Sequence, residues 1–445
     1  MAGNLPTVGA SQGVPGYWRI VLALTLIYTY AFVDRVILSL LVDPIRTSLG
    51  VSDVQIGLLL GLAFAGLYCV CNVPSGYFAD RTNRRPLMAM ASVLWALMTI
   101  LCGTAHSFTQ LFVARMGVGI AESVVAPVSF SLIRDAVPSR SRALAFSIYG
   151  MAPMIGAAVS LTGGGLLLKA AGNGAFHAVP LLSTLEPWQC TMVILGVLGL
   201  PLGLVPFIFR EPPRLGGAAG REQGLFAAIV SACRFIVQNR RIYAPLLTFS
   251  AFGAMISFGS SAWLPAAMSR HWHLAPREIG PPLGIMTLIG GIVGLLFCGW
   301  IMNRSVRRGG TTLGYGIIGV SGTALGVVLA FLAPTLTLSY AGLQFTYFFI
   351  GVSYAAGATT LGEVTPISMM GRVSALYLVV QTLVGQSAGP FVVAFVSKSF
   401  FNGPADIPRA LSLTLVGLAA VCVLAASTLI RRHRLGALKP IVVPA

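Results

Sequence analysis

Apolar residues run along this chain in stretches of about 20, separated by short polar segments. A helix rises about 1.5 Å per residue, so each stretch can cross the ~30 Å hydrocarbon core of a bilayer. The pattern therefore predicts an all-α membrane protein. We expect twelve spans, at residues 17–42, 54–79, 86–104, 108–135, 142–168, 188–209, 242–268, 278–302, 311–332, 337–362, 372–398 and 407–431.

Composition supports this interpretation. The 445 residues are 56% hydrophobic and 9% charged, with a mean hydropathy of +0.85, whereas a soluble protein carries roughly a quarter charged residues. The seven cysteines fall mostly within the apolar stretches and show no metal-ligand spacing, so we expect no metal, no cofactor and no disulfide framework.

The net charge of +17 reflects membrane topology rather than nucleic-acid binding. The basic residues do not lie on one solvated face interleaved with aromatics, as a nucleic-acid interface requires. Instead, 21 of the 29 Lys and Arg fall in the loops and tail on the side of the N-terminus. The positive-inside rule then places both termini in the cytoplasm of a multi-pass inner-membrane protein. No signal peptide is evident, and the first span would direct insertion.

An internal repeat predicts two related halves. Residues 76–85 read GYFADRTNRR and residues 299–308 read GWIMNRSVRR, which share the pattern G-x-x-x-[DN]-R-x-x-R-R after the second span of each set of six. We expect an N-terminal segment (1–16), a six-helix bundle (17–209), a linker with an amphipathic helix (210–241), a second bundle (242–431) and a tail (432–445).

Four charged residues lie inside predicted spans: Asp34 and Arg35 in the first, Arg115 and Glu122 in the fourth. Counted from the cytoplasmic ends at helical rise, Asp34 lies ~24 Å, Glu122 ~18 Å and Arg115 ~28 Å deep. Arg115 and Glu122 are seven residues apart, on nearly one helix face. If the two spans are neighbours, all four charges share one polar pocket.

Two interpretations of these charges remain. They form either a static buried cluster that fixes helix packing, or a titrating site on a transport path. A proton on Glu122 would free Arg35 and Arg115, whose guanidinium groups suit a phosphate or carboxylate. Our hypothesis is that protons and an anionic or zwitterionic headgroup compete for this network.

The chain resembles the major facilitator superfamily, whose signature G-x-x-x-D-R-x-x-R-R it matches fully at residues 76–85. Residues 32–35 (FVDR), 114–123 (ARMGVGIAES), 139–145 (SRSRALA) and 210–213 (REPP) resemble a bacterial member of its Spinster-like branch. The resemblance implies two pseudo-symmetric six-helix bundles that alternate access to a central cavity. It also implies lysophospholipid- or sphingolipid-like substrates, proton coupling at Asp34 and Glu122, and headgroup binding at Arg35 and Arg115.

Further residues are candidates for substrate contact or gating. Among the aromatics of the first and seventh spans, which line the cavity in relatives, we expect Tyr30, Phe258 and Trp263 to contact substrate, although any one of them can simply pack in the core. The basic loops are either topology signals or a cytoplasmic gate, in which the resemblance pairs Asp80 with Arg372. Asn303 would weaken the second copy of this latch, and Glu363 is either a solvated helix end or a gate residue. The gating candidates are Asp80, Arg81, Arg85, Asn303, Arg304, Glu363 and Arg372.

We therefore expect a monomeric secondary transporter of an amphipathic or lipid substrate, working by proton-coupled exchange. The sequence holds no Walker loop, G-x-S-x-G or H-E-x-x-H, so no enzyme is predicted. The alternatives are a multidrug exporter or a proton-coupled transporter of small organic anions. A membrane scaffold or receptor is disfavoured, because it would not need four buried charges.

Overall fold

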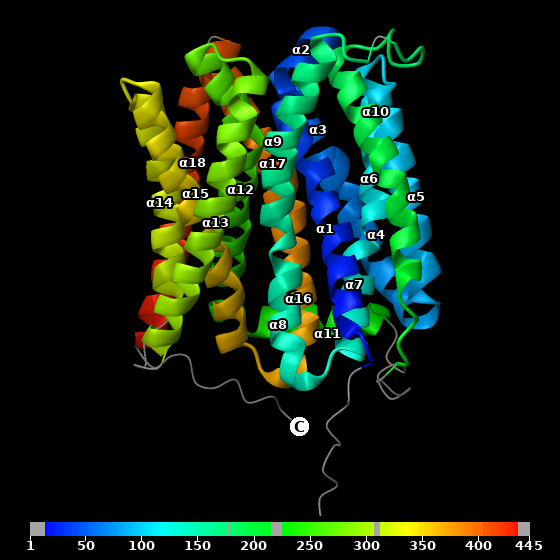
Figure 1. Cartoon of the computed structure of the whole chain (residues 1–445). Helices are drawn as coiled ribbons and strands as arrows, with labels where there is room; N and C mark the ends of the chain where they lie inside the picture. Colours follow the sequence, from blue (N-terminus) through cyan, green and yellow to red (C-terminus); the bar gives the residue numbers. More distant parts are fainter. Residues whose placement is uncertain (1–13, 177, 215–224, 307–311, 402, 435–445) are drawn as a thin grey trace, which may run out of the picture.

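The structure is a computed structural model that describes residues 14–176, 178–214, 225–306, 312–401 and 403–434. These residues form helices joined by short connections, with no strand among them. Two groups of helices stand side by side, and α1 begins at the same end of the molecule where α18 ends (Figure 1). We call the opposite end the distal end.

The first half holds ten α-helices and a 3₁₀ segment. They are α1 (Tyr17–Leu40), α2 (Val42–Leu49), α3 (Asp53–Leu60), α4 (Leu62–Arg81), α5 (Arg84–Gly103), α6 (Phe108–Glu122), α7 (Val125–Ala136), α8 (Ser139–Gly150), α9 (Ala152–Gly172), α10 (Pro187–Gly199) and η1 (Leu200–Ile208).

The second half follows α11 (Leu225–Gln238), which lies in the predicted linker. It comprises α12 (Arg240–Trp272), α13 (Pro276–Val306), α14 (Leu313–Leu332), α15 (Leu336–Val364), α16 (Ile367–Val380), the π-helical turn η3 (Gln381–Gln386), α17 (Ser387–Phe400), η4 (Pro404–Asp406) and α18 (Ile407–Arg434).

The helices are long and apolar enough to confirm a multi-pass membrane protein. Within the described ranges, eleven helical segments meet the length and hydropathy of a membrane span. The 29-residue α15 lies where the tenth span was predicted. The predicted all-α fold is therefore confirmed.

Several predicted spans are interrupted. The second span breaks at Gly61 between α3 and α4, the fourth at Ser123 between α6 and α7, and the eleventh contains η3. A Cβ on Gly61 would lie 2.4 Å from the Ser387 carbonyl oxygen, so the break in the second span packs directly on the eleventh. Hydropathy alone did not reveal these breaks, because the residues on both sides are equally apolar.

Small residues let the halves meet closely. Gly280 and Gly284 of α13 pack on α9, where a Cβ would lie 2.3 Å from the Leu161 carbonyl oxygen and 2.2 Å from the Thr162 hydroxyl oxygen, respectively. Gly57 of α3 packs on Pro390 of α17 in the same way. Close helix contacts in membranes use small residues because they allow backbones to approach.

Candidate functional site

The four charged residues form two ion pairs between α1 and α6. Arg35 Nε lies 2.7 Å from Glu122 Oε2, and Arg115 Nη1 lies 2.9 Å from Asp34 Oδ2. Asp34 and Arg35 are adjacent, so their side chains leave α1 in different directions. Arg115 and Glu122 are two turns apart, and each therefore meets a different member of the α1 pair. The structure thus brings together all four predicted residues.

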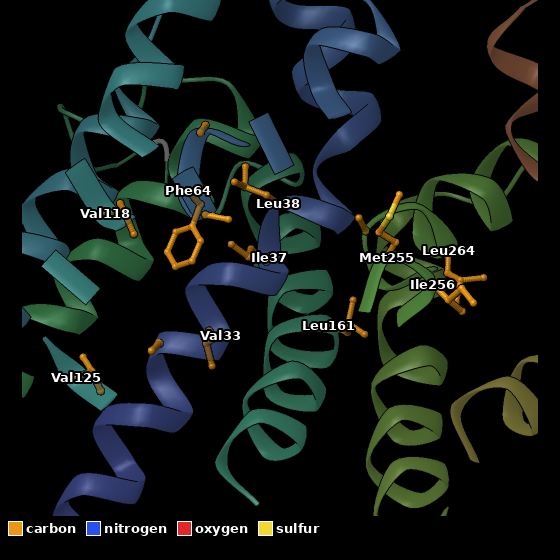
Figure 2. Packing of buried hydrophobic residues seen from close by; sticks show 14 of the residues in the cluster. Val33, Ile37, Leu38, Phe64, Val118, Val125, Leu161, Met255, Ile256 and Leu264 are labelled. Carbon is orange, nitrogen blue, oxygen red and sulfur yellow. The ribbon is translucent and has the colours of Figure 1, made fainter. Parts of the chain in front are cut away.

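Apolar packing surrounds these pairs. Figure 2 shows Val33 and Ile37 of α1, Phe64 of α4 and Val118 of α6 in the buried cluster. Gly119 allows this packing, since a Cβ there would lie 2.4 Å from the Phe64 carbonyl oxygen. The α6 backbone between the two charged positions therefore rests directly on α4.

Burial makes the pairs costly to break. The side chains of Asp34 and Glu122 are 1% and 0% exposed, and that of Arg115 is 2% exposed. Removing one partner of such a pair leaves an uncompensated charge, at a cost of roughly 3–5 kcal/mol. Arg35 differs, with 10% of its side chain exposed. Of the four, Arg35 has the most exposed side chain.

Three aromatic rings surround the guanidinium of Arg35. Its Cζ lies 4.8 Å from the Phe32 ring centroid, 4.6 Å from Phe64 and 4.8 Å from Tyr68. A cation near the face of an aromatic ring gains about 0.5–2 kcal/mol, most when water is excluded. The rings can therefore hold the Arg35 charge in place even when Glu122 is engaged elsewhere.

The carboxylates of the two ion pairs differ in how fully they are hydrogen-bonded, although each pair has a buried arginine nitrogen without a partner, Nε in Arg115 and Nη2 in Arg35. Asp34 is bound through both oxygens, because Thr99 Oγ1 lies 2.9 Å from Oδ1. In the other pair, Arg35 Nη2 and Glu122 Oε1 are buried without a hydrogen-bond partner. Unsatisfied buried polar atoms are rare and mark a strain, a ligand or a water site. This pair therefore offers one free donor and one free acceptor.

Of the predicted aromatic contacts, Phe258 and Trp263 lie on α12 in the second half, whereas Tyr30 lies one turn before Asp34 on α1. Tyr30 OH donates to the Leu195 carbonyl oxygen of α10, and Trp263 Nε1 donates to that of Pro390 in α17 at 2.8 Å. Trp263 is fully buried. Phe258 lines a cavity of about 30 Å³ in the second half together with Ser257 and Gln381. Substrate contact by these three residues stays a prediction, and the wall of this second-half cavity is partly polar.

The predicted gating residues occupy the end of the molecule near the chain ends. Arg81 Cζ lies 3.6 Å from the Tyr77 ring centroid, and Arg85 Nε donates to the Pro206 carbonyl oxygen at 2.9 Å. Arg372 Nη1 donates to Ser231 Oγ of α11 at 3.1 Å. The latch between Asp80 and Arg372 stays a prediction. Asp80, Asn303 and Arg304 are exposed, and the Glu363 side chain lies outside the described part of the chain.

Arg84 forms an ionic network at this end that the sequence analysis missed. Its side chain is fully buried, with Nη1 2.5 Å from Asp135 Oδ2 and Nε 2.5 Å from Glu211 Oε1. Nη2 also donates to the Pro212 carbonyl oxygen at 3.0 Å. Three sequence features could have revealed this network: the arginine of the repeated motif, an aspartate that ends the fourth span, and a Glu-Pro pair after the sixth span. Arg84 thus ties these three span ends together.

No resident metal ion is indicated in the described ranges, where no group of three or more His, Cys, Asp or Glu could hold one.

Comparison with known proteins identifies the family. The sequence profile of the Major Facilitator Superfamily matches residues 24–390, so the chain belongs to this superfamily. It is 27% identical over 427 residues to an MFS-type efflux pump of Mycolicibacterium smegmatis, covering 93% of this chain and 94% of the relative. It is 26% identical over 291 residues to a probable L-galactonate transporter of Escherichia coli, covering 62% and 60%.

A solved structure narrows the resemblance. The chain matches a bacterial homologue of the human lysosomal transporter Spinster, crystallised inward-facing and unoccupied, with a TM-score of 0.79 and 25% identity. The match covers 97% of this chain and 100% of that chain. The predicted resemblance to a bacterial Spinster-like member is confirmed, and as a member of the superfamily the chain is a secondary transporter rather than an enzyme.

Proposed function

We propose that this superfamily member exchanges protons for an amphipathic substrate with a zwitterionic headgroup, of the lysophospholipid or sphingolipid kind, by alternating access. The observation that carries the proposal is the Arg35–Glu122 pair, with its free donor Nη2 and free acceptor Oε1. A zwitterion presents the complementary pair, an anionic phosphate and a cationic amine.

The phosphate and the amine of the headgroup bind different residues in this proposal. Phosphate oxygens accept from the Arg35 guanidinium, whose planar donors match such groups. The amine lies against Glu122, and the rings of Phe32, Phe64 and Tyr68 surround the headgroup's site. The neighbouring Asp34–Arg115 pair, whose carboxylate is hydrogen-bonded through both oxygens, holds α1 and α6 together beside this site.

Proton coupling follows from competition at Glu122. A proton on the carboxylate removes the negative charge that holds the amine, so Glu122 cannot bind a proton and the amine at the same time. Substrate bound at one membrane face is then released at the other face by proton uptake, and the proton is later replaced by new substrate. Asp34, which pairs with Arg115, is the second proposed proton acceptor of the network.

The orientation belongs to the same proposal. Basic residues concentrate at the end where the described chain begins and ends, which we place in the cytoplasm of an inner-membrane protein. The distal end then faces outward. The protein acts as a monomer, because each chain holds the complete pair of halves.

Transport into proteoliposomes tests this function. Lysophosphatidylethanolamine uptake driven by a pH gradient should be saturable, and Glu122→Gln should abolish the gradient dependence. Arg409→Ala is the matched control, since Arg409 is exposed and pairs locally with Asp406. Full gradient-driven transport by both Glu122→Gln and Asp34→Asn would contradict the proton site.

A second candidate substrate is a small organic anion, favoured by the similarity to the L-galactonate transporter. An anion without an amine would bind only the Arg35 donor and would leave the Glu122 carboxylate without a cationic partner. A substrate panel in the same proteoliposomes separates the two. Uptake of small sugar acids, with no response to lysolipids, would favour this second function, and resistance to several unrelated drugs on overexpression would favour an efflux pump.

A further inference from the structure

A single arginine joins the two halves at the distal end. Arg270 of α12 donates to Asp43 Oδ1 from Nε at 2.9 Å and from Nη2 at 2.8 Å. It also donates to Asp53 from Nη1 at 2.9 Å and from Nη2 at 2.8 Å. Its Nη1 lies 2.9 Å from the Pro404 carbonyl oxygen. We call Arg270, Asp43 and Asp53 the distal clasp.

The partners come from opposite halves. Asp43 lies in the first turn of α2 and Asp53 in the first turn of α3, whereas Arg270 lies in the last turn of α12. Gly50 adopts a φ of 63° and ends α2, and Ser52 caps α3, so the corner between them holds both carboxylates beside one guanidinium. The Arg270 side chain is only 9% exposed. The planar fork of arginine donors lets one side chain serve two carboxylates and a carbonyl at once.

The contact between halves continues below the clasp. Trp263 lies two turns beneath Arg270, and its Nε1 donates to the Pro390 carbonyl oxygen. Pro390 and Ala394 of α17 in turn pack on Gly57 of α3, where a Cβ would lie 3.0 Å from Pro390 and 3.3 Å from Ala394. The clasp therefore covers an apolar, closely packed seam between the halves.

Within the described ranges, two further ion pairs near the clasp each stay inside one half. Arg46 Nε lies 3.5 Å from Asp53 Oδ1, within the first half, and Arg409 pairs with Asp406 at 2.9 Å within the second. Neither pair has to break when the halves separate, so both pairs serve as internal references for the clasp.

We propose that the distal clasp is the outer gate of the transport cycle. The seam between α3 and α17 opens only after Arg270 releases both Asp43 and Asp53, so the strength of the clasp sets how often the site faces outward. The proposal rests on alternating access in the proposed function. It assigns Trp263 to the closed seam rather than to the substrate.

Labelling of a buried interface cysteine tests the gate. Ala394→Cys is introduced after the accessible native Cys71 and Cys233 are replaced by serine, and a membrane-impermeant maleimide is applied from outside. Arg270→Ala should raise the labelling rate by about tenfold or more, as expected for loss of a close charge pair. Asp43→Asn and Asp53→Asn should each raise it less, and Arg409→Ala should leave it unchanged.

The result is independent of substrate and of protons. Labelling of Arg270→Ala at the parent rate would overturn the gate while leaving the proposed function intact, whereas failed transport with normal gating would overturn only the function. If Arg270→Ala does not fold, the two asparagine variants decide, because each keeps one carboxylate on Arg270. Hydrogen exchange of residues 53–60 in the native-cysteine protein provides a second readout, and it should accelerate in the same variants.

Discussion

One set of arginine–carboxylate pairs lies within a single half of the molecule, whereas another set connects the two halves. The pairs of Arg35 and Arg115 lie within the first half, between α1 and α6. Those of Arg270 connect the first half to the second. When the halves move against each other as rigid bodies, the first set stays intact and the second must break.

This difference separates what each set can control. In the proposed function the inner pairs respond to protons and ligands, because breaking them requires another partner to replace the lost one. The clasp responds to the relative position of the halves. We therefore propose that the same chemistry serves binding in one place and gating in the other, and substitutions should separate the two functions.

The largest effect is expected for Arg35→Ala. It removes the donors proposed to bind phosphate and leaves Glu122 buried without its partner, so transport should fall by about 100-fold or more, since each charge-assisted hydrogen bond is worth roughly 1.5–3 kcal/mol. Labelling of Ala394→Cys should not change. Arg35→Lys keeps the charge but loses the fork, and initial uptake rates should fall between those of Arg35→Ala and the parent. If Arg35→Ala changed gating as much as transport, the separation of the two sets would be wrong.

Glu122→Gln should give the next largest effect. The amide keeps the shape of the side chain but cannot take up a proton, so transport against a substrate gradient should fall by about tenfold or more, while downhill exchange continues. Uptake with and without an imposed pH gradient measures this. Asp34→Asn is the matched comparison, and a larger loss of pH dependence in Asp34→Asn would move the proton site to the other ion pair.

Gly61→Ala tests the seam without touching a charge. Its Cβ would lie 2.4 Å from the Ser387 carbonyl oxygen, so α4 and α17 must separate. Overpacking of this kind costs about 1–3 kcal/mol, which should raise outside labelling of Ala394→Cys by about tenfold. Gly163→Ala is the control, because nothing lies within 4 Å of its added Cβ. Equal labelling in both variants would contradict the closed-seam interpretation.

Thr99→Val should have the smallest effect. It removes the hydroxyl beside Asp34 Oδ1 and leaves the Arg115 pair in place. The loss of one such hydrogen bond, roughly 1 kcal/mol, should lower the apparent substrate affinity by about fivefold. Thr104→Val, which removes an exposed hydroxyl with a local partner, should leave it unchanged. A large loss of affinity in Thr99→Val would show that Asp34 acts in binding directly.

The sequence predicted much of this arrangement and missed specific parts. Hydropathy predicted the spans, and the rarity of buried charges identified Asp34, Arg35, Arg115 and Glu122. Their pairing was not predictable, because it depends on how α6 is rotated against α1. Gly119 decides how closely α6 meets α4, and its sequence context carries no sign of that contact.

The clasp and the Arg84 network were missed for a different reason. Asp43, Asp53 and Arg270 lie at span ends, where charged residues are ordinary, and Arg270 is more than 200 residues from both carboxylates. Only the fold brings them together. The interruption at η3 escaped for a related reason, since a π-helical turn leaves the hydropathy of a span unchanged.

The central claim is that a proton and the cationic part of the headgroup compete for Glu122. The direct measurement is the affinity for lysophosphatidylethanolamine in detergent as a function of pH, in the parent protein and in Glu122→Gln. As the pH falls through the range where Glu122 takes up a proton, we predict that the parent loses about tenfold in affinity for each pH unit. The affinity of the Glu122→Gln variant should show no such dependence on pH. A flat profile in the parent, or an equal slope in Glu122→Gln, would contradict the account.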